Sequence, residues 1–160
     1  MAAAVVPDLP WENYHDVVTP RWRTDTAPLY RGDRRSPEDV FRLGFAPQNP
    51  ENMSLRAHTG TKTESAYVST TRDPKVAANR SLNCGQDPSQ SDGHVYIVDA
   101  PGGIDMVKTR GFSDPYNARE VSFPGGVRPE FIRGAGKMDP TTGNFVDFIP
   151  NPNYLPRETP

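Results

Sequence analysis

Proline and glycine occur throughout this chain and limit the length of the helices and strands that it can form. The 160 residues include 18 prolines and 13 glycines, a share above the usual one but below the roughly 25–30% that indicates disorder. Hydrophobic residues make up 34% of the chain, and the mean hydropathy is -0.70. We therefore expect one domain with a modest core, many turns and much loop.

The segment "SPEDVFRLG" predicts a short helix by its capping residues. Ser36 suits the N-cap, Pro37 suits the first helical position, and Gly44 suits the C-terminal stop. Acidic residues in the first turn favour the positive end of the helix dipole. The side chains expected on the buried side are Val40, Phe41 and Leu43.

Apolar runs that alternate or are rich in β-branched residues predict strands, most strongly in "HVYIVDA". Between two of these runs, Asp73 and Pro74 repeat the cap-and-proline signal for a helix that ends near Leu82 or Gly85. The predicted strands are Ala27–Arg31, Ala66–Thr71 with Tyr67 and Val68 inward, His94–Ala100, Arg119–Phe123 and Asn144–Ile149.

The order strand, helix, strand, helix and then several strands favours an α+β fold over a doubly wound α/β fold. Residues 1–26 are interpreted as a leader segment and residues 27–149 as the folded domain. Residues 150–160 are interpreted as an extended, Pro-rich tail that frays.

The net charge and the cysteine content argue against several classes of binding site. A net charge of -2 and a pI near 5.9 give no broad electrostatic footprint for nucleic acid. The single cysteine, Cys84, excludes an intramolecular disulfide, and His15, His58 and His94 are far apart in sequence, so no metal is expected. The N-terminus lacks the basic segment of a signal peptide, and no apolar run reaches the length of a membrane span, so no membrane contact is expected.

Three segments carry an arginine, then Ser-Thr-Thr, and then a glutamate, in that order. "LYRGDRRSPEDVFRLGF" has an aromatic-Arg pair at a strand end before a Pro-Glu-capped helix, "AYVSTT" is a strand, and "NAREVSFPGGVRPEFIRGA" has a strand, a turn and another strand. Together they resemble the bacterial mono-ADP-ribosyltransferase toxins of the cholera and pertussis type. The resemblance covers Leu29 to Ala135, and His58 lies in the interval where those toxins carry a histidine.

The resemblance implies an α+β fold with two packed, mostly antiparallel sheets and short flanking helices around an NAD cleft. It makes Glu120 the candidate catalytic carboxylate. Cleavage of the nicotinamide–ribose bond builds positive charge on the sugar, and an ionised glutamate that accepts from a ribose hydroxyl stabilises this charge, as carboxylates do in glycosidases. The Ser69 hydroxyl would hydrogen-bond Glu120 and hold its rotamer. Arg31 would either bind the NAD phosphates directly or brace the pocket.

The remaining candidates follow from the shape of NAD and from the resemblance. Gly32 would let the backbone approach the nicotinamide amide, and His58 would donate to the ribose. Thr70 and Thr71 would shape the nicotinamide wall. The loop before the strand is the expected site of acceptor recognition, through Phe112, Tyr116, Asn117 and Ala118.

Ala118 departs from the pattern, because the family usually has Glu or Gln two residues before the catalytic glutamate. A methyl group neither orients nor deprotonates an acceptor, so arginine acceptors become doubtful. We expect a target-cell protein as the acceptor, and a nucleic acid less so, since the Gln is missing and the pI is acidic.

The prediction is thus a mono-ADP-ribosyltransferase toxin or effector domain that uses NAD as its substrate. Secretion or delivery into the cytosol of a target cell is expected, and no delivery or immunity partner can be read from the sequence. Two alternatives remain: an NAD glycohydrolase, in which water takes the ADP-ribose, and a non-catalytic module that binds NAD or protein with the same fold.

Overall fold

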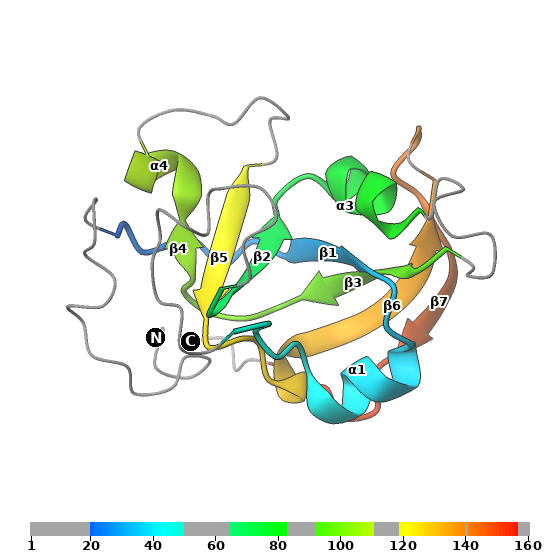
Figure 1. Cartoon of the computed structure of the whole chain (residues 1–160). Helices are drawn as coiled ribbons and strands as arrows, with labels where there is room; N and C mark the ends of the chain where they lie inside the picture. The colour runs from blue at the N-terminus through cyan, green and yellow to red at the C-terminus, as the bar shows by residue number, and fades with distance from the viewer. Residues whose placement is uncertain (1–19, 50–64, 83–91, 111–118, 140, 157–160) are drawn as a thin grey trace.

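Antiparallel strands in one sheet and a few short helices make up the described part of the chain (Figure 1). The structure is a computed structural model that describes residues 20–49, 65–82, 92–110, 119–139 and 141–156. Within these residues the sheet has seven strands in the order β4-β5-β2-β1-β3-β6-β7. The elements are β1 (Leu29–Asp33), α1 (Pro37–Leu43), β2 (Tyr67–Thr71), α3 (Pro74–Ser81), β3 (His94–Val98), β4 (Ile104–Asp105), α4 (Met106–Arg110), β5 (Glu120–Pro124), the 3-10 helix η3 (Pro129–Phe131), β6 (Ile132–Met138) and β7 (Phe145–Pro150).

The sheet divides into two halves where β1 meets β2. In the described strands, Tyr30 and Thr71 are the one pair of Cα partners between them, whereas β1 with β3 and β2 with β5 each pair over five residues. In Figure 1, β2, β4 and β5 run across the direction of β1, β3 and β6. The α+β prediction is confirmed, and the two expected sheets are present as two halves of one hydrogen-bonded sheet.

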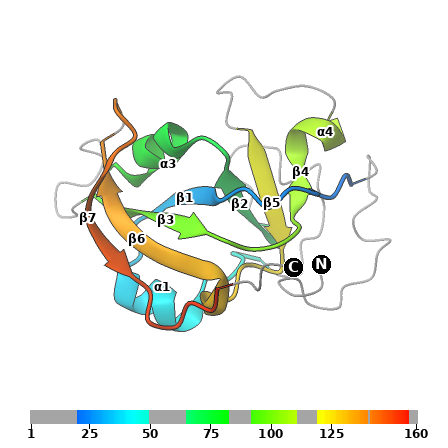
Figure 2. The ribbon, with the colours of Figure 1, turned by 180° about the vertical axis from the view of Figure 1, so that it is seen from behind.

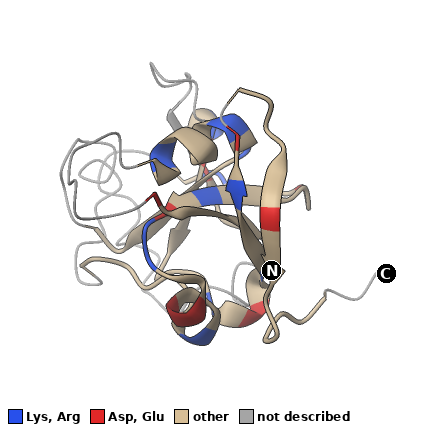
Figure 3. Cartoon of the chain, turned by 90° about the vertical axis from the view of Figure 1, so that its right-hand side faces the viewer, with Lys and Arg blue, Asp and Glu red and all other residues tan. Residues whose placement is uncertain are grey.

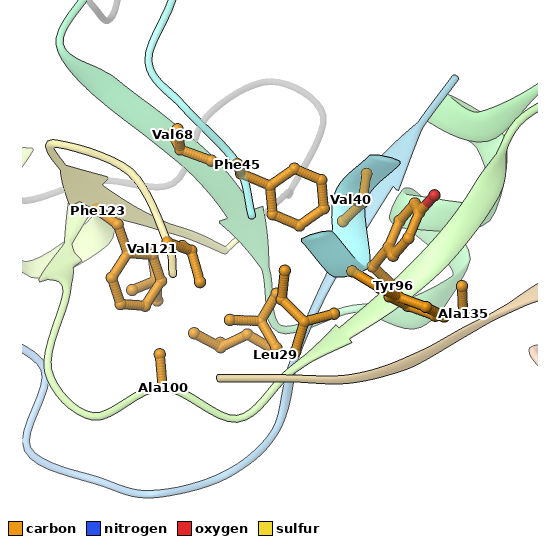
Figure 4. Packing of buried hydrophobic residues seen from close by; sticks show 13 residues of the cluster. Leu29, Val40, Phe45, Val68, Tyr96, Ala100, Val121, Phe123 and Ala135 are labelled. Carbon is orange, nitrogen blue, oxygen red and sulfur yellow. The ribbon is translucent and has the colours of Figure 1, made fainter. Parts of the chain in front are cut away.

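The main core fills the space between these halves (Figure 4). Val68 and Phe123 come from one half, and Leu29 and Tyr96 come from the other; all four are at most 4% exposed. The ring of Tyr96 meets the ring of Phe45 edge-on, with centroids 5.2 Å apart. Strand β2 is buried on both faces, because Tyr67 belongs to a second cluster, and this explains why two neighbouring residues both point inward. Packing in this core fixes how the two halves of the sheet are oriented. It thereby also fixes the positions of the strand ends between them.

Helix α1 begins and ends where its capping residues predict. The Ser36 Oγ accepts a hydrogen bond from the Asp39 backbone N–H at 3.2 Å, and Gly44 has a φ of 72°, which favours glycine. Val40 is 1% exposed, but Leu43 is 62% exposed. The expectation that Leu43 lies on the buried side is therefore wrong, because Leu43 lies off the face of α1 on which Val40 and Phe41 pack into the core.

Hydrogen bonds tie residues beyond both expected boundaries to the domain. Arg23, in the supposed leader, is 4% exposed, and its Nη1 donates to the carbonyls of Ala100 and Gly102 at 3.0 Å each. At the other end, Pro150 belongs to β7, the outermost strand in Figure 2, and Asn151 is 6% exposed. Both Arg23 and Asn151 therefore form hydrogen bonds with residues of the domain that was expected over 27–149.

Replacing Asn151 with alanine is expected to lower the free energy of unfolding by about 1–3 kcal/mol. Its amide donates to the carbonyls of Pro129 at 3.0 Å and Ile132 at 2.7 Å, and both would lose a partner. Urea unfolding followed by circular dichroism measures the change. Asn79→Ala, at an exposed position of α3, is the matched control and should change stability by less than about 0.5 kcal/mol. Equal effects of the two variants would contradict the anchoring role.

Candidate active site

A cavity of about 310 Å³ lies where the two halves of the sheet separate. Strands β1, β2 and β5 and helix α3 supply its walls. Strands β1 and β2 pair at one position of the described residues. The neighbouring residues of both strands therefore line this cavity instead of pairing with each other. The lining residues are Tyr30, Arg31, Gly32, Ser69, Thr70, Thr71, Arg80 and Glu120.

The β2–β5 ladder places four polar side chains on one face. Thr71 lies opposite Glu120, and Ser69 lies opposite Ser122. Side chains alternate along a strand, so the intervening Val121 packs in the core on the other face. The alternation that buries one face therefore presents the carboxylate and the hydroxyls together on the other.

Hydroxyl groups on both strands hold the Glu120 carboxylate. Ser69 Oγ donates to Glu120 Oε2 at 2.9 Å, so the hydrogen bond expected between these residues is present. Ser122 Oγ donates to the same oxygen. The carboxylate is thus fixed at the start of β5, beside the cavity.

Arg31 is anchored in the wall between two partners. Its Nε donates to Asp33 Oδ2 at 3.0 Å and its Nη1 to the Ser69 carbonyl at 2.7 Å, and its guanidinium carbon lies 5.2 Å from the centroid of the Phe45 ring. Burial lowers the pKa of Arg31, and the charge of Asp33 opposes this shift. Of the two roles expected for Arg31, these contacts favour bracing of the pocket.

A second cavity, of about 530 Å³, adjoins the first, since Arg31 and Ser69 line both. Asp33 lies in its wall and pairs with Arg35, whose Nη2 is 2.7 Å from Asp33 Oδ2. Burial alone would raise the pKa of Asp33, but the hydrogen bonds from Arg35 and the charge of Arg31 hold it below the usual value. The wall therefore carries two arginines around one carboxylate, which gives it a net positive charge.

Gly32 lines the cavity, but packing accounts for the glycine. A Cβ atom at this position would lie 2.1 Å from the Ala77 carbonyl oxygen and 2.7 Å from the Ser81 backbone nitrogen. Both atoms belong to α3. The missing side chain therefore lets α3 lie directly on β1, which is a reason for glycine that was not predicted.

The two threonines take part in local hydrogen bonds. Thr70 Oγ1 donates to the Val121 carbonyl at 2.7 Å, so its hydroxyl is already used between β2 and β5. Thr71 Oγ1 accepts from the Asp73 backbone N–H at 3.0 Å, where α3 begins. Thr71 thereby links the polar face of β2 to the helix that covers the cavity.

The other expected site residues lie outside the described residues. These are His58 and the acceptor loop residues Phe112, Tyr116, Asn117 and Ala118. The chain re-enters the described part at Arg119, which has a φ of 45°, a left-handed conformation that is uncommon for residues other than glycine.

The structure adds two residues to this site. Arg80 is an exposed cation on α3 that lines the smaller cavity, and Figure 3 shows Lys and Arg positions on this helix, at the top of the view. No local pattern predicted that α3 covers β1, so Arg80 could not be assigned to the site from the sequence. Ser122 could have been found, because it follows Glu120 by two residues in a predicted strand and shares its face.

Neither a metal site nor a membrane helix is found in the described residues. No group of three His, Cys, Asp or Glu residues among them is arranged to hold a metal ion. None of the described helices is long and apolar enough to cross a membrane.

Comparison with known proteins points to one family. The profile of the family described as Scabin-like matches residues 29–154. A "Guanine-specific ADP-ribosyl transferase" of Streptomyces coelicolor is 34% identical over 148 residues, which are 88% of this chain and 68% of the relative. "Pierisin" of Pieris brassicae is 32% identical over 136 residues, which are 79% of this chain but 15% of Pierisin.

Solved structures agree with this match. The Scabin toxin from Streptomyces scabies in complex with NADH superposes with a TM-score of 0.81 at 31% identity, covering 99% of this chain and 93% of the toxin. A guanine-specific ADP-ribosyltransferase with NADH and GDP superposes with a TM-score of 0.77 at 31% identity, covering 96% of this chain and 92% of that one.

Proposed function

We propose, from the premise that the chain belongs to the Scabin-like family of NAD-dependent ADP-ribosyltransferases, that it transfers ADP-ribose to a guanine base. In this proposal Arg31, Ser69 and Glu120 are the Arg/Ser-Thr/Glu set of the cholera and pertussis type, and they form the site of NAD cleavage. The observation that carries it is the hydrogen bond from Ser69 to Glu120 in a cavity that Arg31 also lines.

NAD is an elongated molecule with two nucleotide halves, and two adjoining cavities suit it. The nicotinamide ribose lies beside Glu120 in the smaller cavity. The other half extends into the larger cavity, where Arg35 and the net positive wall attract the pyrophosphate. Arg31 stands between the two halves, because it lines both cavities.

The bond that breaks joins the ribose C1′ to the nicotinamide nitrogen. Its electron pair leaves with the nicotinamide, which departs as a neutral molecule, and the positive charge passes to the ribose. The Glu120 carboxylate stabilises this charge. A guanine nitrogen then attacks C1′ and loses a proton to solvent, so the products are ADP-ribosylguanine, nicotinamide and one proton.

The proposed acceptor differs from the target-cell protein that we expected. A relative that is 34% identical is named guanine-specific, and a structure similar to this chain is described with GDP, whereas no relative reported above is named for a protein acceptor. The acidic pI of the whole chain was a poor guide, because the charge beside the cavity is set locally by Arg31, Arg35 and Arg80. A guanine nucleotide carries phosphate, which the exposed Arg80 beside the smaller cavity would attract.

Incubation with labelled NAD and a panel of acceptors tests this proposal. The panel contains GMP, AMP, DNA oligonucleotides with and without guanine, and the proteins of a cell lysate. We expect label in GMP and in the guanine-containing oligonucleotide, with release of nicotinamide. Free ADP-ribose alone would favour the glycohydrolase, labelled protein would restore the protein acceptor, and unconsumed NAD would favour a binding module.

Action as a toxin on target cells is part of the same proposal. Scabin, a relative of known structure, is described as a toxin from Streptomyces scabies. Secretion or delivery into the cytosol of a target cell would bring this enzyme to the NAD and guanine nucleotides that it uses.

A further inference from the structure

No role was predicted for Ser122 from the sequence, yet it contacts the candidate catalytic group. It is 0% exposed, and its Oγ donates to Glu120 Oε2. It follows Glu120 by two residues on β5, so both side chains lie on the same face of the strand. Its cross-strand neighbours are Ser69 on β2 and Ile104 on β4.

The complete burial of the Ser122 hydroxyl has to be explained by its contacts. Moving a hydroxyl from water into the protein interior is costly unless it forms a hydrogen bond. An alanine would occupy almost the same space, and the opposite face of β5 shows that this strand otherwise buries Val121 and Phe123. The bond to Glu120 is charge-assisted and therefore stronger than a bond between neutral groups. This bond accounts for a serine here.

We propose that Ser122 is a positioning residue for NAD cleavage, which holds the Glu120 carboxylate together with Ser69. This inference rests on the proposed function. The two hydroxyls reach the same oxygen from neighbouring strands, so they restrict rotation of the carboxylate more firmly than either does alone. Ser122 is fully buried and acts through Glu120, without contact to NAD.

The kinetics of Ser122→Ala test the role. Nicotinamide release should slow about tenfold in kcat, the order expected for one hydrogen bond to a charged group, while KM for NAD stays within about twofold because NAD contacts are kept. The matched control is Ser81→Ala. Ser81 is 4% exposed, and its hydroxyl donates to the Ala78 carbonyl at 2.7 Å, away from Glu120. It should keep the kcat of the unaltered protein.

A double-mutant comparison separates positioning from general structural damage. In a Glu120→Gln background, Ser122→Ala should change the residual rate less than about twofold, because the group that it positions is gone. A further tenfold loss in that background, or an equal loss in Ser81→Ala, overturns the inference. Normal kcat in Ser122→Ala beside a slow Glu120→Gln also overturns it and leaves the proposed function intact. Full activity of Glu120→Gln would instead remove the proposed role of Glu120.

Discussion

Replacement of Glu120 by glutamine is expected to slow NAD cleavage by a factor on the order of 10²–10³, or ~2.7–4 kcal/mol in the activation barrier. Glutamine keeps the shape of the side chain but removes the negative charge that faces the ribose as positive charge develops. Nicotinamide release by the purified variant measures the effect. The affinity for NAD should change little, because most of the proposed NAD contacts lie elsewhere in the two cavities.

The matched control for this prediction is Glu38→Gln. Glu38 is an exposed acidic residue in the first turn of α1, and the same loss of charge there should leave the rate unchanged. Equal rates for Glu120→Gln and Glu38→Gln would mean that another carboxylate acts in NAD cleavage.

Gly32→Ala is expected to lower the free energy of unfolding by about 3 kcal/mol, at the upper end of overpacking effects. The added Cβ would lie 2.1 Å from the carbonyl oxygen of Ala77, and a backbone atom inside a helix cannot turn aside. Helix α3 would have to move off β1. Arg80 would move with it, so NAD cleavage should fall as well.

Thermal and urea unfolding measure this loss, with Gly143→Ala for comparison. Gly143 has a φ of 74°, and the nearest atom to a Cβ added there is 3.7 Å away. Alanine at this position would therefore strain the backbone but would not clash with neighbouring atoms. It should cost about 1 kcal/mol. If Gly32→Ala cost no more than Gly143→Ala, α3 would not be held against β1 as tightly as the structure indicates.

Local signals predicted most of the elements, because their causes lie within a few residues. Ser36 and Pro37 start α1, and Asp73 caps α3 through a hydrogen bond to the Lys75 backbone N–H at 2.9 Å. Where the prediction failed, the cause was tertiary. The exposure of Leu43 depends on which face of α1 packs against the core, and the burial of Asn151 depends on carbonyls of η3 and β6.

The features of the site also divide into those that local sequence signals predicted and those that depend on tertiary packing. The pairing of Ser69 with Glu120 was expected from the resemblance, and the alternation of side chains along β5 accounts for its geometry. The packing constraint on Gly32 was not predicted, because only the packing of α3 reveals which atoms an added side chain would meet. Arg80 was missed for the same reason. The alternation of side chains along a strand follows from neighbouring residues. The packing of a helix over a cavity depends on residues that are far apart in the sequence.

A crystal structure of the Glu120→Gln variant soaked with NAD tests the central claim most directly. The slow variant should retain intact NAD, with the nicotinamide ribose against residue 120 and Ser69 in the smaller cavity and the pyrophosphate toward Arg35 in the larger one. NAD bound outside these two cavities, or with its nicotinamide ribose remote from residue 120, would contradict the account.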